Sequence, residues 1–533
     1  MAENPILFKI TNLKQYFPLK SKGMYVKAND GITVNIYEGE TLGLVGESGC
    51  GKSTMGRTLL KLYNATDGKI MYNGRTLLQV APQYAFKTIK NLKANKAKML
   101  KLQEECERLE AQAKKKGWTD EDAPETEERF RALTALAEAR KQAFDATFDI
   151  TSIIGGLVIL DDLDPVIAVY QELFDAAREH KNIYVKRKDN KVDLEDLRYR
   201  NAHKPSASRE NKIKALEKER EDIINKMLQK DEQMRAIQMK IDQLREPYMN
   251  DPLFMEYDAD REGAVDLARL TYSEMRDLRV DMQLIFQDPY SSLDSRMTVG
   301  QIIGEGMLAH RQFKRNDDRM KERVLQVMED CGLAPYFLHR YPHQFSGGQR
   351  QRIGIARALS LSPKFVVCDE AVSALDVSIQ SQIINLLQTL KDRDHLTYLF
   401  ITHDLAVVKY ISDRIAVMYL GVIVELANTE DIFACPMHPY TEALLSAIPT
   451  ADENEARELV VLEGDIPSPV NPPPGCKFHT RCKYATDICM HVVPELIEVV
   501  PGHMVACHHR LESTCETEYI ESQAAAVAEG TEQ

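Results

Sequence analysis

The sequence has no long hydrophobic run. Its longest apolar stretch, Ile150 to Leu160, is interrupted by Thr151 and Ser152 and is followed at once by two aspartates. A helix that spans a bilayer needs about 20 predominantly apolar residues, so the sequence predicts no transmembrane segment. The first residues, Met1 to Lys9, also lack the basic start and apolar core of a signal peptide, and none is expected.

Cysteine and positive charge are both scarce. Ten cysteines in 533 residues are too few for a disulfide scaffold, which favours a reducing, cytoplasmic compartment. The chain has 68 Lys+Arg against 81 Asp+Glu, a net charge of −13. A broad nucleic-acid surface needs an excess of basic residues, so no nucleic-acid partner is expected. The length corresponds to roughly three to four domain-sized units.

Charge density changes abruptly along the chain. The stretch 81–270 holds 35 Lys+Arg and 38 Asp+Glu but only four glycines, which predicts a charged, mostly helical insertion within a glycine-richer chain. The last 23 residues carry six Glu and no Lys or Arg, as disordered tails often do. The expected parts are a nucleotide-binding domain (1–79 plus 273–430), a helical insertion (80–272), a proline- and cysteine-rich C-terminal region (431–510) and a disordered acidic tail (511–533).

Outside the insertion, short β-branched runs alternate with helical patterns. Three runs, Thr41–Val45, Phe365–Cys368 and Tyr398–Ile401, are almost entirely apolar, as strands buried on both faces of a parallel sheet are. Helices between such strands would cover the two faces. The sequence therefore predicts an α/β domain with a central parallel sheet.

Two segments of the insertion repeat apolar residues at heptad spacing. The longer would form a helix of about 48 Å, at ~1.5 Å per residue. Because the chain leaves and re-enters the α/β domain, the two segments could pair as an antiparallel coiled-coil hairpin bearing a small cap at 118–207. Two amphipathic helices on a compact subdomain are the alternative. The heptad positions are Ile213, Leu216, Ile223, Met227, Met234, Ile237, Ile241 and Leu244, and Leu92, Met99, Leu102, Cys106, Leu109 and Ala113.

A phosphate-binding pattern follows the first apolar run. Glycines let successive backbone N–H groups point at phosphate oxygens, a lysine neutralises the β- and γ-phosphates, and a serine hydroxyl binds Mg²⁺. A chance match is the alternative, which the strand before and the helical pattern after disfavour. The residues are Gly46, Glu47, Ser48, Gly49, Cys50, Gly51, Lys52, Ser53 and Thr54.

A pair of carboxylates ends the second apolar run. Asp369 would hold the Mg²⁺ shell, and Glu370 would orient or deprotonate the attacking water, as in a Walker-B site. Taken alone, a strand that ends in Asp-Glu is as typical of a surface as of a catalytic site.

The segment Phe345 to Arg352 (FSGGQRQR) resembles the signature motif of the ATP-binding cassette (ABC) ATPases. A glycine turn capping a helix would fit these residues but not their position before the Walker-B strand. Gln287 in a Q-loop, Asp376 in a D-loop and His403 in an H-loop follow the order of the same family. With these motifs the chain is identified as a member of the ABC ATPases, which implies the P-loop NTPase fold.

The resemblance implies a mechanism. Two cassettes would sandwich two ATP molecules, each bound by the phosphate loop of one chain and the signature of the other. Ala371 stands where the family usually has proline, a difference that touches loop stiffness. The implied residues are Glu370, His403 and Gln287 for catalysis, Ser53, Gln287 and Asp369 for Mg²⁺, and Ser346, Gly347, Gly348, Gln349 and Asp376 with the phosphate loop for ATP.

An aromatic side chain that stacks on adenine is expected ahead of the phosphate loop in this family. Tyr16 is the candidate, and Phe17 and Tyr25 are alternatives. A plain core aromatic would fit Tyr16 equally well.

The flanks of the motifs resemble the ATPases of oligopeptide/dipeptide importers, among them the second ATPase subunit of the oligopeptide permease. The resemblance covers residues 5–79 and 273–510, and the proline-rich stretch Pro467 to Cys476 is its specific part. It implies ATP-driven peptide import by a chain peripheral on the cytoplasmic face of the cell membrane. The implied partners are a paralogous ATPase or a second copy of this chain, two transmembrane permeases and an external peptide-binding protein.

Four cysteines gather in the C-terminal region, namely Cys476, Cys482, Cys489 and Cys507. They lack the C-x2-C pair typical of zinc sites. Some peptide-importer ATPases carry a [4Fe–4S] cluster at the matching cysteines, and four thiolates satisfy its ligation. An iron–sulfur cluster, zinc and unmetallated thiols all stay open.

The insertion also fits a different class of protein. The alternative is a soluble ABC ATPase of chromosome, repair or ribosome function that uses the insertion as an interaction arm, because a coiled coil inserted into a cassette resembles the chromosome-maintenance family. In the chromosome-maintenance proteins the coiled coil is far longer, and the proline–cysteine stretch is absent. The net charge of the insertion, −3, also disfavours a nucleic-acid surface. The importer is the preferred interpretation, and the insertion could still be an interaction module grafted onto it.

Overall fold

The computed structural model describes residues 4–21, 23–118, 127–261, 263–315, 317–448 and 460–511. Its contacts divide the chain into two compact units. The first comprises Met1–Ile70, Leu278–Ile303 and Leu325–Gln533, and the second comprises Met71–Asp277 and Gly304–Val324. Residues 304–324 therefore lie with the insertion. The expected acidic tail, apart from Leu511, lies outside the described residues.

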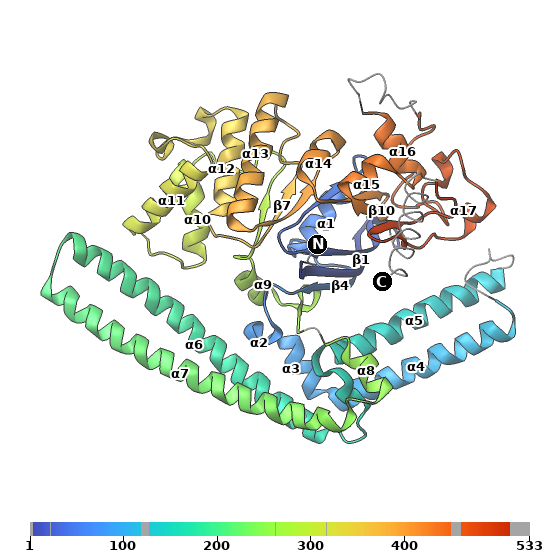
Figure 1. Cartoon of the computed structure of the whole chain (residues 1–533), viewed down its shortest axis with the longest axis horizontal. Coiled ribbons are helices and arrows are strands. Elements are labelled where there is room, and N and C mark those ends of the chain that lie inside the picture. Colours follow the sequence, from blue (N-terminus) through green and yellow to red (C-terminus); the bar gives the residue numbers. More distant parts are fainter. Residues whose placement is uncertain are drawn as a thin grey trace, which may run out of the picture. The chain divides into compact units, whose positions relative to one another are not determined.

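Within the described residues, the first unit is built on an eight-stranded sheet (Figure 1). Four successive pairings at one side of the sheet are parallel, and three at the other side are antiparallel. In spatial order the strands are β11 (Ile497–Val500), β12 (His503–Val505), β10 (Val422–Asn428), β9 (Arg414–Tyr419), β3 (Thr41–Val45), β8 (Thr397–Ile401), β7 (Phe365–Asp369) and β6 (Met282–Ile285).

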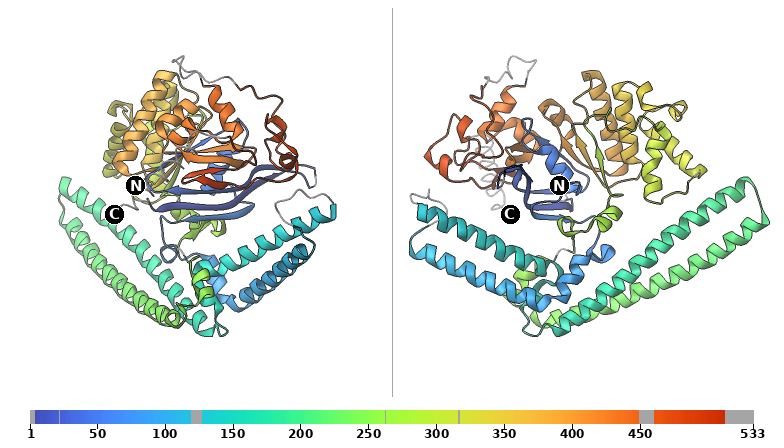
Figure 2. Two further views of the ribbon diagram at one scale, coloured as in Figure 1. Left: turned by 45° about the vertical axis from the view of Figure 1, so that its right-hand side comes forward. Right: turned by 180° about the vertical axis from the view of Figure 1, so that it is seen from behind.

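The three predicted apolar runs are the adjacent central strands β3, β8 and β7. Every residue of each strand is buried, because helices pack along the sheet (Figure 2). The prediction of an α/β domain with a central parallel sheet is confirmed. Parallel strands end at the same edge of a sheet, so the loops that follow β3, β8 and β7 lie together. The helices of this unit include α1 (Lys52–Leu59), α12 (Gly347–Leu359), α13 (Val377–Asp394), α14 (Leu405–Ile411), α15 (Thr429–Ala434), α16 (Pro439–Ser446) and α17 (Asp487–His491).

A second, antiparallel sheet carries the N-terminal residues. Strand β1 (Ile6–Pro18) pairs with β2 (Tyr25–Tyr37), and β4 (Asp67–Tyr72) lies on the other side of β1. The border between the two units falls within β4. The last two residues of β4, in the second unit, pair antiparallel with β5 (Val265–Asp266).

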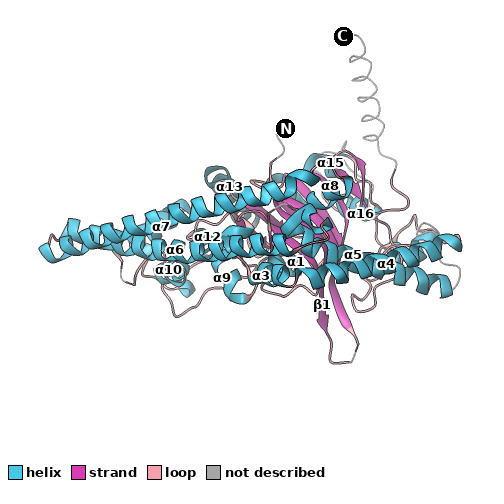
Figure 3. Cartoon of the chain, turned by 90° about the horizontal axis from the view of Figure 1, so that it is seen from below, coloured by secondary structure: helices cyan, strands magenta, loops and turns pink. Residues whose placement is uncertain are grey.

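The second unit contains two long helical hairpins (Figures 1 and 3). The predicted heptad segments are helical, and every heptad residue is buried or partly buried. The expected pairing of these two segments with each other is wrong, because each packs against the helix next to it in the sequence. The expected cap at 118–207 instead holds the whole of both partner helices. The hairpins are α4 (Leu92–Lys115) with α5 (Glu127–Ile154) and α6 (Asp164–His203) with α7 (Ala207–Arg245).

The two hairpins diverge from a common base formed by α3 (Gln83–Lys90), the 3-10 helix η1 (Gly155–Ile159) and α8 (Pro252–Asp258). Glycine at position 156 allows a close approach, since a Cβ there would lie 2.4 Å from the carbonyl oxygen of Phe254. Among the described residues, Arg131–Ile159 alone is a helical segment long and apolar enough, by length and composition, to cross a membrane. In its most apolar window, 56% of the residues are buried inside the structure, as packing against α4 and α8 requires.

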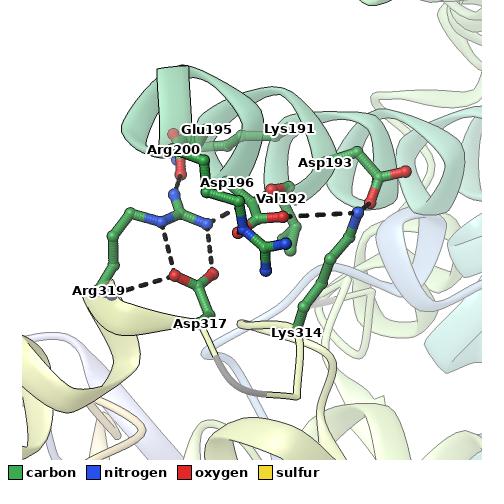
Figure 4. Close-up of polar contacts among 9 residues, drawn as sticks. All are labelled: Lys191, Val192, Asp193, Glu195, Asp196, Arg200, Lys314, Asp317 and Arg319. Carbon is green, nitrogen blue, oxygen red and sulfur yellow. Dashed lines mark hydrogen bonds and ion pairs between the residues drawn. The ribbon is translucent and has the colours of Figure 1, made fainter. Parts of the chain in front are cut away.

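Helix α6 also binds the residues that lead into α11 (Asp318–Asp330), as Figure 4 shows. The carboxylate of Asp317 accepts hydrogen bonds from Nε (3.1 Å) and Nη2 (2.7 Å) of Arg319. The same guanidinium places Nη1 3.0 Å from Oε2 of Glu195, and Lys314 Nζ lies 2.6 Å from Oδ1 of Asp193. These charge-assisted contacts explain why residues 304–324 belong to the second unit.

Candidate nucleotide-binding and hydrolysis site

The phosphate loop joins β3 to α1 and depends on glycines at two close approaches. A Cβ on Gly46 would lie 2.1 Å from the carbonyl oxygen of Met418, and one on Gly51 would lie 2.0 Å from that of Ala28. Both glycines have positive φ, 151° and 102°, which other residues rarely adopt. Gly51 caps α1 without a side-chain hydrogen bond, so the first N–H groups of the helix remain available to an anion.

The lysine of the loop is buried within it. Lys52 Nζ donates to the carbonyl oxygens of Gly46 (2.7 Å) and Glu47 (3.0 Å), and it also lies 3.6 Å from Sγ of Cys50. Burial raises the pKa of the Cys50 thiol above its ordinary value, so this side chain is a neutral part of the loop wall. The arrangement places one positive charge inside a loop of backbone amides, as phosphate binding requires.

Two of the three residues expected to hold Mg²⁺, Ser53 and Asp369, lie 316 positions apart in the sequence and are in direct contact. Ser53 Oγ donates to Oδ1 of Asp369 at 2.5 Å, and Asp369 is buried at the end of β7. Arg57 Nη2 lies 3.1 Å from the other carboxylate oxygen of Asp369. The sequence analysis missed Arg57, although its position four residues after Ser53 places both on one face of α1. Hydroxyl and carboxylate oxygens are suitable ligands for Mg²⁺.

Two predicted catalytic residues, Gln287 and His403, converge on the carboxylate of the third, Glu370. Gln287 Nε2 donates to Oε2 of Glu370 at 2.5 Å, and His403 Nδ1 lies 3.6 Å from Oε1. Glu370 has a positive φ of 46°, a conformation that costs roughly 1–2 kcal/mol for a residue with a side chain. Strain of this kind is typical of functional sites. The structure therefore brings together Gln287, His403 and Glu370, and it places Gln287 on the carboxylate rather than beside Ser53.

The signature residues form the start of α12. Ser346 Oγ accepts from the backbone N–H of Gln349 (3.4 Å), and Gln349 Oε1 accepts from that of Ser346 (3.2 Å), which is a capping box. Asp376 caps α13 in a similar way by accepting from the N–H of Ile379 at 3.0 Å. The binding of ATP from a second cassette by Ser346, Gly347 and Gly348 stays a prediction.

Tyr16 lies near the end of β1 and is half-buried. Its hydroxyl donates to Oδ1 of Asp30, and its backbone N–H donates to Oγ1 of Thr66 at 2.9 Å. Burial, together with the neighbouring Asp30, raises the pKa of Tyr16 far above its ordinary value. Lys27 Nζ lies 6.0 Å from the centre of the ring. Stacking of this ring on adenine stays a prediction.

The four C-terminal cysteines line a single narrow pocket together with Phe478, His479 and His508. Burial and the neighbouring thiols raise the pKa of Cys476 to about 11 and that of Cys507 to about 12, so these two thiols are protonated at neutral pH. Among the described residues, no group of three His, Cys, Asp or Glu side chains is arranged to hold a metal ion. The thiols thus share a pocket but do not have the geometry of a formed metal centre.

The sequence matches two family models of known proteins. Residues 29–153 and 253–373 match the family model of ABC transporters, and residues 424–489 match that of the oligopeptide/dipeptide transporter C-terminal region.

Several curated proteins share this cassette. A candidate peptide import ATP-binding protein of Brucella ovis is 57% identical over 242 residues, which are 45% of this chain and 76% of that protein. The oligopeptide transport ATP-binding protein AppF of Bacillus subtilis is 50% identical over 246 residues, 46% of this chain and 74% of that protein. Among solved structures, a dimeric bacterial ABC transporter cassette is similar at 15% identity and a TM-score of 0.40, over 79% of this chain and 98% of that one. The chain belongs to the ABC transporter ATP-binding proteins, in the group that carries the oligopeptide/dipeptide transporter C-terminal region.

Proposed function

We propose that this chain is the ATP-hydrolysing subunit of a peptide importer, peripheral on the cytoplasmic face of the cell membrane. The observation that carries the proposal is the convergence of Gln287 and His403 on the carboxylate of Glu370, beside a phosphate loop whose Ser53 contacts Asp369. The C-terminal match to peptide transporters and the names of the relatives support peptides as the cargo.

The residues of the site suit the hydrolysis of ATP to ADP and phosphate. Lys52 and the loop amides neutralise the phosphates, while Ser53 and Asp369 offer oxygen ligands to Mg²⁺, which supplies further charge stabilisation. The bond from Gln287 fixes one oxygen of Glu370. The other oxygen is then free to accept a proton from the water that attacks the γ-phosphorus, and His403 lies beside it.

Replacing the base tests this chemistry. Glu370→Gln should bind ATP as the wild type does but lower steady-state hydrolysis at least about 100-fold, because general-base catalysis contributes a factor of that order. Glu329→Gln, an exposed glutamate on α11, is the matched control and should hydrolyse ATP normally. Undiminished hydrolysis by Glu370→Gln would refute the assignment of the base.

The partners follow from the same proposal. We expect a second ATPase, paralogous or identical, two permeases and an external peptide-binding protein. Affinity purification of the tagged chain from detergent-solubilised native membranes, followed by mass spectrometry, should recover two multi-span permeases. Recovery from the soluble fraction with ribosomes or chromosomal proteins would instead support the alternative function, in which the two hairpins of the second unit serve as interaction arms.

The cysteine pocket supports a further part of this proposal. The four cysteines surround one pocket and would ligate a [4Fe–4S] cluster as thiolates, after moving closer together than in the described residues, where they do not form a metal site. Iron and sulfide content and visible absorption should be found in anaerobically purified protein and be lost in Cys489→Ser. Zinc in place of iron, or neither metal, would contradict the cluster.

A further inference from the structure

The segment between the first two pocket cysteines reaches into the phosphate loop. Arg481, directly before Cys482, places Nη1 2.8 Å from Oε2 and Nη2 3.2 Å from Oε1 of Glu47. Glu47 is the second residue of the phosphate loop, and its backbone N–H donates to the hydroxyl of Tyr440 at 2.9 Å. The side chain of Arg481 is only 7% exposed. A bidentate pair of this kind fixes both position and orientation of a carboxylate.

A second basic residue of the same segment acts on the other side of the loop. Lys477, directly after Cys476, places Nζ 2.9 Å from Oδ2 of Asp30, whose other oxygen accepts from Tyr16. The residue beside Asp30 is Asn29, and its side-chain amide donates to the carbonyl oxygen of Gly51 at 3.0 Å. Lys477 thus holds Asp30 in β2, the strand whose Asn29 contacts Gly51, the last glycine of the loop.

Aromatic packing makes the segment rigid between these two contacts. Phe478 is buried against Tyr419 and Tyr440, with ring centroids 5.2 Å and 5.3 Å apart. The backbone N–H of Cys476 also donates to the carbonyl oxygen of Cys489 at 2.8 Å. Movement of the segment is therefore transmitted to both contacts.

The charge of Glu47 needs a partner because of where it lies. A carboxylate in a loop that binds triphosphate repels the ligand, and the repulsion between close, partly buried charges is on the order of kcal/mol. Arg481 neutralises this carboxylate and holds it in one orientation.

We propose that Arg481 and Lys477 are positioning residues for ATP, through which the cysteine segment keeps the phosphate loop neutral and in its binding shape. The inference rests on the proposed ATP site, but it does not depend on peptide transport. Their contacts are with Glu47 and Asp30 rather than with the base Glu370, so they should act on ATP affinity and leave the chemical step unchanged.

The affinity of the full-length chain for ATP, measured by titration calorimetry, tests this inference. Arg481→Gln should weaken binding about tenfold, because it leaves Glu47 uncompensated beside the phosphates. The double variant Arg481→Gln/Glu47→Gln should recover most of the loss, because the repelling charge is removed. In hydrolysis assays, KM for ATP should rise in Arg481→Gln while kcat changes less than about twofold.

Matched variants separate positioning from simple stabilisation. Lys483→Gln lies one residue beyond Cys482 and removes an exposed lysine that pairs with the half-buried Glu442, and this variant should bind ATP normally. Lys477→Gln should weaken ATP binding by a smaller factor than Arg481→Gln. If Arg481→Gln does not fold, Arg481→Lys keeps the charge without the bidentate contact and should show an intermediate loss.

Two results would overturn the inference. One is normal ATP affinity in Arg481→Gln while the wild type binds ATP, whether or not the melting temperature of the variant falls. The other is a double variant as weak as, or weaker than, the single variant, since that would indicate lost packing only. Failure of the wild type to bind ATP would instead refute the proposed function.

Discussion

The two units of this chain bury their side chains to different extents. In the first unit, the central strands β3, β7 and β8 are buried along their whole length. In the second, α7 buries only one narrow stripe of its side chains. Ion pairs at the surface join it to α6, namely Lys230–Glu179, Lys240–Glu172 and Arg198–Glu217. The cassette is thus stabilised mainly by apolar burial, and the insertion by a narrow seam supplemented with charge pairs. They should therefore respond differently to core truncation, pH and salt.

Core truncation should show the largest difference. Phe365 in β7 is fully buried, and its ring centroid lies 4.6 Å from that of Phe8. Phe365→Ala should cost about 3–5 kcal/mol of unfolding free energy and lower the urea midpoint of the transition that ATP shifts. Ile241→Ala, in the seam of α7, should cost about 2–3 kcal/mol and leave that transition and ATP hydrolysis intact. Equal shifts of one shared transition would show that the two units unfold together.

Acid should destabilise the cassette through a buried histidine. His438 caps α16, and its Nδ1 accepts from the N–H of Tyr440 at 3.0 Å. Burial lowers its pKa to about 4 from 6.5, with Glu425 opposing the shift. Between these pH values the unfolded chain binds a proton that the folded chain does not, so stability is full above pH 6.5 and is lost as the pH falls towards 4, by about 2 kcal/mol at pH 5.

A variant that keeps the cap isolates this effect. His438→Asn retains an acceptor at the N-cap but does not titrate. Urea midpoints of both proteins at pH 7.5 and pH 5 should show a smaller loss in the variant, since the remaining acid-sensitive groups are shared. Identical losses would rule out His438 as the titrating group.

The smallest expected effects concern two charge pairs, one in each unit. Asp317→Asn removes the charge that binds Arg319 (Figure 4), and because Asp317 is buried the cost should be about 1–2 kcal/mol, partly masked at high salt. Asp294→Asn removes an exposed pair with Arg296 and should change stability by less than about 0.5 kcal/mol. Thermal unfolding at low and high salt measures both. Equal effects would show that burial does not strengthen the contact with α6.

The accuracy of sequence-based prediction differed between the same two units. The central strands and the phosphate loop were predicted because each is encoded within a few consecutive residues, and the order of the sheet then brings Ser53 to Asp369. The pairing in the insertion was not predicted, because the apolar pattern of α6 is interrupted where it packs on α7. Asn190 is buried there and donates to the carbonyl oxygen of Leu216 and to Glu219.

Local signals could have corrected part of this. The turn Lys204-Pro205-Ser206 separates α6 from α7, and proline near a helix start is typical of such breaks. The contact of Arg481 with Glu47 joins residues 434 positions apart, and no local pattern encodes it. The one sequence signal that could have singled out Arg481 as a functional residue is its position next to Cys482, one of the pocket cysteines.

The insertion leaves the cassette after β4 and rejoins it at β5. These two strands bear on how the insertion could have been acquired and on how it could be removed by engineering. Met71 and Tyr72 at the end of β4 lie opposite Asp266 and Val265 of β5, antiparallel. The two ends of residues 73–264 are therefore already adjacent, and the segment between them imposes little loop-closure entropy on the rest of the chain. A two-residue hairpin turn can join such strands. The segment that holds both hairpins could therefore be deleted in principle. A cassette could gain or lose it in one step without a change in the strand register of its sheets.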